Sequence, residues 1–351
     1  MGDDLRHSTD DDPGIRRTGR KRFRYVDDRS GRDVADDRTL ERIAALAIPP
    51  AWTDVWICPQ ANGHIQATGR DAKGRKQYRY HADHRALRET AKFADLVPFG
   101  EALGDLRKAV DADLRRHDLG QERVLALVLA LLDRTAIRIG NQSYAKANKT
   151  FGLTTLRDGH VDISGSTIAF CFVGKGAKLH EVQLTDRRLA TLVRRCRDLP
   201  GQQLFQWQDA DGDRHGIQSD DVNSRLRELT GLDVTAKTFR TWHASVGAAA
   251  LLAGQPLPES QRGVSSAVVE VCDEIATTLG NTRAVARASY VHPAVPAAFE
   301  AGVLQDWWRD GPSRSAGGLE PDERKLLAVL RKAKRRGLGA GPASRSDRRA
   351  A

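Results

Sequence analysis

Short runs of apolar residues, separated by Gly and Pro, mark the N-terminal part of the chain after residue 22. The runs DVWICPQ, GHIQATG and KQYRYH are each of strand length. In KQYRYH, Tyr78 and Tyr80 alternate with polar residues, and this period of two places both rings on one face of a strand. The pattern predicts a small β-rich domain over residues 23–90.

Helical spacing takes over near residue 85. Apolar residues recur at intervals of three and four at Leu103, Leu106, Val110 and Leu114, which is typical of an amphipathic helix. The next run, VLALVLALLDRTAIRIG, is apolar on nearly every side and predicts a buried central helix that ends at Arg138. Helical patterns continue to about residue 310, so residues 91–310 are predicted to form a larger, mainly α domain.

Three strand patterns interrupt the helices between residues 160 and 184, namely HVDI, TIAFCFV and KLHEVQL. Ser-Gly-Ser separates the first two, and Gly174-Lys175-Gly176 separates the last two. Such short Gly-containing links are typical of hairpin turns, so a three-stranded meander is predicted within an α+β fold.

The two ends of the chain are rich in charge. Residues 1–22 contain few large apolar residues and are predicted to be a disordered tail. Residues 311–351 include RKAKRRGLGAGPASRSDRR and are predicted to be a basic C-terminal tail, in which a helix runs into Gly, Ser and Arg. Such a tail would add non-specific affinity for a polyanion.

The charge of the chain indicates the kind of partner it binds, and its cysteines indicate the compartment in which it works. The 351 residues carry a net charge of +10 that is spread along the sequence, which favours a polyanionic partner, nucleic acid ahead of an anionic membrane. A basic protein with solvated charged faces is the alternative. The four cysteines are scattered without a C-x-x-C pair, which argues against zinc and disulfides and fits a reducing compartment. The polar start and the lack of a long apolar run predict an intracellular protein.

Cleavage of a phosphodiester without a metal needs a nucleophile, fixed cations and a proton donor. Tyr290, in LGNTRAVARASYVHP, is either a nucleophile or a buried aromatic residue on a helix. Arg138 and Arg240 could grip phosphate oxygens, or could cap a helix and pack beside Trp242. Lys175, at a hairpin tip, is either a mobile acid or an ordinary exposed lysine.

The sequence resembles type IB DNA topoisomerases of the poxvirus-like and bacterial branch. The resemblance covers about residues 23–310, with the motifs in the order of the family, and rests on GRDAKGRKQYRYH, IRIGNQSYAKANKTFGLTTLRDGHV, FVGKGAKLHEVQL, KTFRTWHAS and LGNTRAVARASY. It implies the fold of that family and of the tyrosine recombinases. It also implies relaxation of supercoiled DNA through single-strand cleavage and religation, without ATP or a required metal.

The resemblance assigns each catalytic role to a position. Tyr290 would form a 3′-phosphotyrosyl link, Arg138 and Arg240 would hold the non-bridging oxygens, and Lys175 would protonate the 5′ oxygen. The residues implied to contact DNA are Arg75, Lys76, Gln77, Tyr78, Tyr80, Tyr144, Lys146 and Lys237. The partner would be double-stranded DNA, clamped by a monomer in the cytoplasm at the nucleoid.

Asn281 departs from the pattern of the family, since most members have histidine there. An amide still donates a hydrogen bond to a phosphate oxygen but adds no charge, so activity is expected to persist at a lower rate. A left-handed helix cap is the structural alternative for Asn281. His292 and His243 are interpreted as structural or DNA-facing residues. A tyrosine recombinase and a non-catalytic DNA-binding homologue remain the alternative functions.

Overall fold

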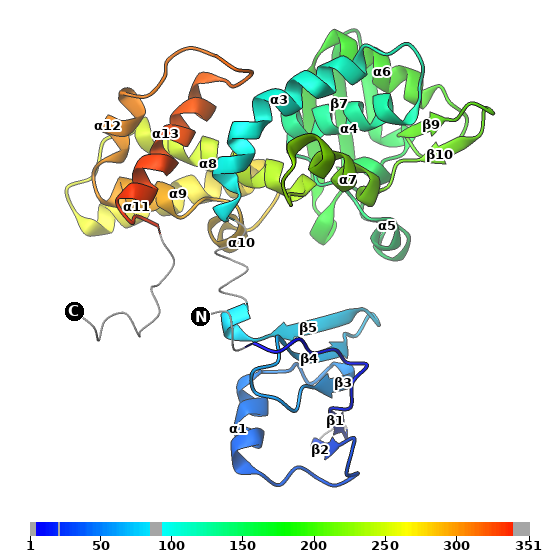
Figure 1. Ribbon diagram of the computed structural model, residues 1–351, viewed down its shortest axis with the longest axis vertical. Helices are drawn as coiled ribbons and strands as arrows, with labels where there is room; N and C mark the ends of the chain where they lie inside the picture. The colour runs from blue at the N-terminus through cyan, green and yellow to red at the C-terminus, as the bar shows by residue number, and fades with distance from the viewer. Residues whose placement is uncertain (1–4, 20–21, 85–92, 340–351) are drawn as a thin grey trace. The chain divides into compact units, whose positions relative to one another are not determined.

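The computed structural model describes residues 5–19, 22–84 and 93–339, and the chain divides into two compact units (Figure 1). The smaller unit is Met1–Lys92 and the larger is Phe93–Ala351. Each unit has its own cluster of buried apolar side chains. None of the helices in the described ranges is long and apolar enough to cross a membrane.

The smaller unit is built on a five-stranded antiparallel sheet with the order β2-β1-β3-β4-β5, against which helix α1 packs (Figure 1). The elements are β1 (Ile15–Thr18), β2 (Arg24–Asp27), α1 (Asp37–Ala45), β3 (Thr53–Ile57), β4 (Ile65–Arg70) and β5 (Lys76–Tyr80). Ile43 of α1 packs with Ile15, Val55, Ile57 and Ala67 of the sheet. The predicted β-rich character of this part of the chain is confirmed.

The prediction of disorder over residues 1–22 is wrong for residues 5–19. Ile15, which begins β1, is 3% exposed, and β1 lies between β2 and β3 in the sheet. The indole Nε1 of Trp56 donates a hydrogen bond of 2.9 Å to the carbonyl of Asp12. One apolar residue, Ile15, is sufficient to order this segment because the neighbouring strands β2 and β3 supply its hydrogen bonds and the rest of the core. The amino-acid composition of residues 1–22 does not reveal these partners.

The larger unit is mainly helical. Its helices are α3 (Leu96–Leu114), α4 (Gln121–Thr135), α5 (Gln142–Asn148), α6 (Arg187–Arg197), α7 (Ser219–Thr230), α8 (Ala236–Ala253), α9 (Gln261–Thr278), α10 (Arg283–Ser289), α11 (Ala294–Glu300), α12 (Leu304–Arg309) and α13 (Pro321–Arg335). Every residue of α4 from Val124 to Leu132 is buried, as predicted for the central helix.

The predicted meander is present in the larger unit. It consists of β6 (Val161–Ser164), β7 (Thr167–Val173) and β8 (Leu179–Thr185) in the order β6-β7-β8. A short 3-10 turn, η3 (Lys175–Ala177), joins β7 to β8. Two other such turns, η1 (Leu153–Thr155) and η2 (Asp158–His160), precede the meander, and a separate ribbon is formed by β9 (Gln206–Gln208) and β10 (Arg214–Gly216).

The helix predicted within residues 311–351 is present as α13, but the prediction that it belongs to a tail is wrong, because it is packed in the larger unit. This helix lies against α3, α8, α11 and α12 (Figure 1) and buries Leu326, Leu327, Val329, Leu330 and Ala333. Its apolar residues recur at helical spacing between lysines and arginines, so the helix is amphipathic despite its charge. Residues 340–351 lie outside the described ranges.

Candidate active site

Arg138 lies just beyond the central helix and not at its end as predicted. Helix α4 ends at Thr135, and Ala136 adopts a left-handed conformation that turns the chain away. The backbone of Arg138 is then held by Leu153, whose N–H donates to the Arg138 carbonyl over 2.9 Å. Gly152 permits this close approach, because a Cβ there would lie 2.5 Å from the same carbonyl oxygen. The segment after α4 is therefore a fixed support for the Arg138 side chain.

Arg240 on α8 is buried, with 3% of its surface exposed. Its Nη1 donates to the carbonyl of Ala136 and its Nη2 to the carbonyl of Leu279 over 2.8 Å. The guanidinium thus connects α8 to the C-terminal ends of α4 and α9. Burial, and then the charge of Arg138, lower the pKa of Arg240 to about 10, so this arginine stays cationic at neutral pH.

Asn281 follows a turn in which the glycine, and not the asparagine, is left-handed. Gly280 has φ +62°, while the N–H groups of Gly280 and Asn281 donate to the carbonyls of Thr277 and Ala276. This pair of backbone hydrogen bonds is the Schellman motif that ends many helices. The left-handed cap considered for Asn281 is therefore assigned to Gly280, which leaves the Asn281 side chain free for another role.

The amide of Asn281 is oriented by Arg138. Nη2 of Arg138 donates a hydrogen bond to Oδ1 of Asn281. Because a guanidinium can only donate, the amide must present its oxygen to the arginine and its Nδ2 donor elsewhere. Lys178 Nζ also donates to the backbone carbonyl of Asn281 over 2.8 Å. Asn281 is thus positioned as a neutral hydrogen-bond donor.

Tyr290 directly follows α10 and is 7% exposed. The guanidinium carbon of Arg240 lies 5.0 Å from the centre of its ring, and Lys237 Nζ lies 5.5 Å from it. Burial alone would raise the pKa of the phenol, but the charges of Arg240, Arg138 and Lys237 outweigh it, so the pKa of Tyr290 is lowered. A lowered pKa favours the phenolate, which is the nucleophilic form.

Lys175 is exposed in the turn η3, at the end of the β7–β8 hairpin. The residues at the base of this hairpin, and not Lys175 itself, contact the rest of the site. Gly174, which precedes Lys175, lies against the ring of His180, and this ring also lies against Gly280. The turn that carries Lys175 and the turn that carries Asn281 are therefore separated by one imidazole.

His180 was not identified from the sequence, although HEV directly follows the lysine hairpin. It lies near the start of β8, opposite Phe172 of β7, and the two rings stack with centroids 5.3 Å apart. Burial, and then the charges of Arg138, Arg240 and Lys178, lower the pKa of His180, so its imidazole is neutral at pH 7.

The other two histidines considered from the sequence have structural partners. Nδ1 of His292 accepts a hydrogen bond from the Ala294 N–H over 3.1 Å, and burial lowers the pKa of His292 to about 4. Nε2 of His243 bonds the carbonyl of Asp133. Of the two interpretations made from the sequence, structural or DNA-facing, these contacts support the structural one.

Four side-chain nitrogens of the site are buried and have no hydrogen-bond partner among the described residues. They are Arg138 Nη1, Arg240 Nε, Asn281 Nδ2 and His180 Nε2. A buried donor without a partner costs about 1–3 kcal/mol, so native structures rarely leave several of them together. Two of the four belong to cations and the other two can donate. The arrangement therefore suits an anion with several oxygens, such as a phosphodiester, next to the Tyr290 phenol.

The residues expected to contact DNA from the smaller unit lie on β5 or, for Arg75, directly before it. The Tyr78 and Tyr80 rings stack with centroids 5.9 Å apart, which confirms that they share a face. The basic side chains beside these tyrosines form ion pairs within the smaller unit. Lys76 Nζ lies 2.7 Å from a carboxylate oxygen of Asp10. Arg75 pairs with Asp71 over the same distance, 2.7 Å.

Asp71 also fixes the third polar residue of this group, since Gln77 Nε2 donates to its carboxylate over 3.0 Å. The pairing with Arg75 lowers the pKa of Asp71 to about 2. In the larger unit, Lys146 is exposed on α5, and the side chain of Tyr144 lies outside the described part of the structure.

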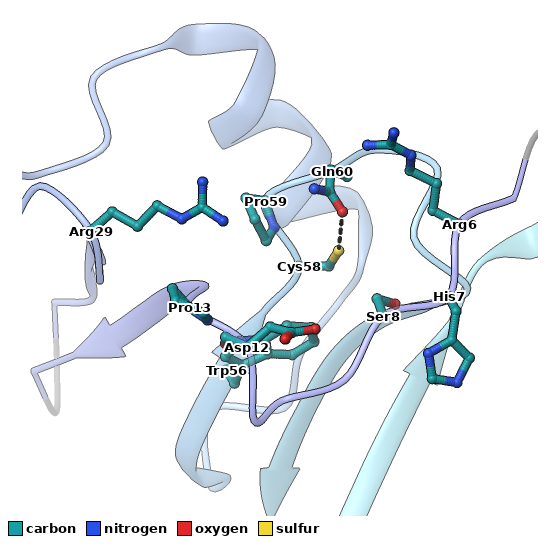
Figure 2. A pocket seen from close by; sticks show the side chains of 10 residues that line it. All are labelled: Arg6, His7, Ser8, Asp12, Pro13, Arg29, Trp56, Cys58, Pro59 and Gln60. Atoms are coloured by element: carbon teal, nitrogen blue, oxygen red, sulfur yellow. Dashed lines mark hydrogen bonds between the residues drawn. The ribbon is translucent and has the colours of Figure 1, made fainter.

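The smaller unit also contains a hollow of about 400 Å³ (Figure 2). Arg6, Asp12 and Trp56 are among its lining residues, and the Trp56 indole is already bonded to the Asp12 carbonyl. Within the described ranges, no group of three or more His, Cys, Asp or Glu residues is arranged to hold a metal ion.

Comparisons with known proteins agree on one family. Residues 81–300 match the family described as eukaryotic DNA topoisomerase I, catalytic core, and residues 22–71 match the bacterial DNA topoisomerase IB N-terminal domain. The chain is 32% identical over 261 residues to DNA topoisomerase 1B of Acanthamoeba polyphaga mimivirus, covering 72% of this chain and 78% of that protein. It is 28% identical over 162 residues to DNA topoisomerase I of Monkeypox virus, covering 45% of this chain and 52% of the viral protein.

Proposed function

Because the chain belongs to the type IB DNA topoisomerase family, we propose that Tyr290 is the residue that cuts and rejoins one strand of duplex DNA. The enzyme is an isomerase that relaxes supercoiled DNA. In the proposed reaction the Tyr290 oxygen attacks the phosphorus and the bond to the 5′ oxygen breaks. A 3′-phosphotyrosyl link and a free 5′-hydroxyl result, and religation reverses both steps.

The group of unpartnered donors around Tyr290 carries this proposal. As the phosphorus becomes five-coordinate, negative charge grows on the non-bridging oxygens, and fixed donors stabilise that charge without having to reorganise. Arg138 and Arg240 supply the positive charge, while Asn281 supplies a neutral donor through the Nδ2 that Arg138 orients. The lowered pKa of Tyr290 serves the same step.

Lys175 is proposed to protonate the departing 5′ oxygen. An exposed lysine at a hairpin tip can reach a bound duplex, and the His180 ring lies between Gly174, which precedes Lys175, and Gly280, which precedes Asn281. The energy of the broken phosphodiester is kept in the phosphotyrosyl bond. The reaction is therefore proposed to need neither ATP nor a metal ion. The enzyme is proposed to act as a monomer that clamps the duplex, in the cytoplasm at the nucleoid, with the DNA contacts on β5, α5 and Lys237.

Relaxation of supercoiled plasmid in EDTA without ATP tests the proposal. We expect the wild-type protein to relax plasmid, and Tyr290→Phe to bind DNA with nearly the wild-type Kd and relax none. Denaturation during cleavage should trap DNA on the wild-type protein through a tyrosyl bond at residue 290. Relaxation by the phenylalanine variant, or a covalent link at another residue, would refute the assignment of Tyr290.

The same assay separates the topoisomerase from a tyrosine recombinase. Relaxation of a plasmid that lacks paired recombination sites is expected only of the topoisomerase. The match of residues 22–71 to a topoisomerase IB N-terminal domain supports this outcome. Tight DNA binding by the wild-type protein without any relaxation would instead indicate a non-catalytic homologue.

A further inference from the structure

The imidazole of His180 is clamped between two glycines of the site. A Cβ on Gly280 would lie 2.3 Å from Cε1 of His180 and 3.0 Å from Nε2. A Cβ on Gly174 would lie 2.5 Å from Cδ2 and 2.7 Å from Nε2. The Phe172 ring stacks on the face of the imidazole. The ring is therefore held in place before any substrate binds, as a group that acts on a transition state should be.

The two glycines are the residues immediately before Lys175 and Asn281. The Nε2 edge of His180 thus faces the backbone of both turns that carry proposed catalytic side chains. This nitrogen is buried and has no partner among the described residues, as is true of the donors on Arg138, Arg240 and Asn281. A histidine retained only for packing could be replaced by an apolar ring without leaving a nitrogen unpaired.

The surroundings of His180 determine which form of the ring can act. Arg138 faces it from the segment after α4, Arg240 faces it from α8, and Lys178 faces it from the β7–β8 hairpin. These charges and burial disfavour the imidazolium, which leaves a neutral ring with one N–H. With the proton on Nε2, that ring offers one more donor to an oxygen held by the two arginines.

We propose that His180 is a further catalytic residue, which donates a hydrogen bond from Nε2 to a non-bridging oxygen of the scissile phosphate. The proposal rests on the function proposed above and extends it. His180 and Asn281 then form a pair of neutral donors that complements the two arginines. No covalent bond to His180 is made, and no proton leaves it during the reaction.

Single-turnover cleavage of a short duplex by three variants tests this role. His180→Phe keeps the ring and its stacking on Phe172 but removes the donor. His180→Gln loses the ring but places an amide N–H near Nε2. We expect His180→Phe to cleave on the order of 10²-fold more slowly than the wild type, as for other fixed donors to a developing oxyanion. His180→Gln should recover to within about tenfold of the wild type, and His180→Ala should resemble His180→Phe.

His215 provides a matched control. It is also stacked across a strand pair on an aromatic residue, Trp207, with centroids 4.6 Å apart, but it lies in the β9–β10 ribbon. His215→Phe should cleave at the wild-type rate. DNA binding and the thermal midpoint are measured for each variant, so that a loss of folding is not taken for a loss of catalysis.

The outcomes separate a donor from a packing role. Wild-type cleavage by His180→Phe overturns the proposal, as does an equal loss in His180→Phe and His180→Gln. A duplex with sulfur at the 5′ bridging position adds a second test, because its leaving group needs no protonation. This substrate should rescue Lys175→Ala but not His180→Phe, and rescue of His180→Phe would overturn the assignment to a non-bridging oxygen. Failure of the wild type to cleave would contradict the proposed function itself.

Discussion

Glu323→Ala should destabilise the larger unit by several kcal/mol. The Glu323 carboxylate is largely buried on α13 and makes a two-pronged ion pair with Arg107 of α3, at 2.7 and 2.8 Å. It also accepts a hydrogen bond of 2.9 Å from the Trp242 indole on α8. Removal of one partner from a buried ion pair costs about 3–5 kcal/mol. Arg107 keeps its second partner, Asp133, so a value near the lower end is expected.

The measurement is thermal unfolding followed by circular dichroism. A loss of 3 kcal/mol in a unit of this size should lower the Tm by roughly 10 °C. Glu101 provides a matched control, because it pairs with Arg331 and connects the same two helices, α3 and α13, at the surface. Since about half of each side chain in that pair is exposed, Glu101→Ala should cost less than about 1 kcal/mol. Equal, small losses in both variants would refute the view that the buried ion pair anchors α13.

The effect of Glu323 should depend on pH. Burial raises the pKa of this carboxyl, but the bonds from Arg107 and Trp242 outweigh it, so the pKa of Glu323 in the folded protein is lowered. A lowered pKa means that the contribution to stability is present above the pKa of the unfolded chain, about 4.3, and is lost as the pH falls through the folded value. The difference in Tm between the wild type and Glu323→Ala should therefore be constant near neutral pH and shrink below about pH 4.

Three further changes probe the candidate site and the DNA contact proposed at strand β5. Asn281→Ala should slow single-turnover cleavage by roughly 10- to 100-fold while Asn281→His is tolerated, and an unchanged rate in the alanine variant would exclude a catalytic role. Gly280→Ala should lose at least about 1 kcal/mol of stability in a denaturant titration and much of the cleavage rate, because it strains a left-handed turn and meets the His180 ring. Asp10→Asn should free Lys76 and tighten DNA binding about two- to fivefold in a fluorescence titration at low salt, whereas weaker binding would contradict this reasoning.

Local sequence patterns were sufficient to predict those features that depend on the residues of a single helix or strand. The alternation of Tyr78 and Tyr80 placed both rings on one face of a strand, and the apolar run from Val124 to Leu132 indicated the buried helix. Both depend on a short period that a single element repeats. Ile15 gave no such signal, because its burial depends on strands that lie elsewhere in the chain.

The candidate site was only partly predictable for the same reason. Its arginines, lysine and tyrosine lie in motifs that resemble a known family, and the structure brings Arg138, Arg240 and Tyr290 together. The position of His180 depends on the register of β7 and β8 and on the turn at Gly280, which meet only in the folded chain. Likewise, the link from Glu323 to Trp242 joins residues that are 81 positions apart. The spacing of apolar residues along one helix or strand carries no information about contacts between residues that are far apart in the sequence.

For the DNA contact proposed at β5, the ion pairs of Lys76 and of Arg75, which directly precedes the strand, affect how DNA binding responds to salt. When a phosphate of DNA displaces Asp10 from Lys76, or Asp71 from Arg75, the freed carboxylate must take up a cation from solution. That uptake offsets part of the release of cations from the DNA, so each of these contacts is closer to an exchange of ions than to a net release. The affinity for DNA should therefore fall less steeply with salt than the number of basic residues on this strand suggests. The enzyme could then stay on the duplex over a wider range of ionic strength while the cut strand rotates.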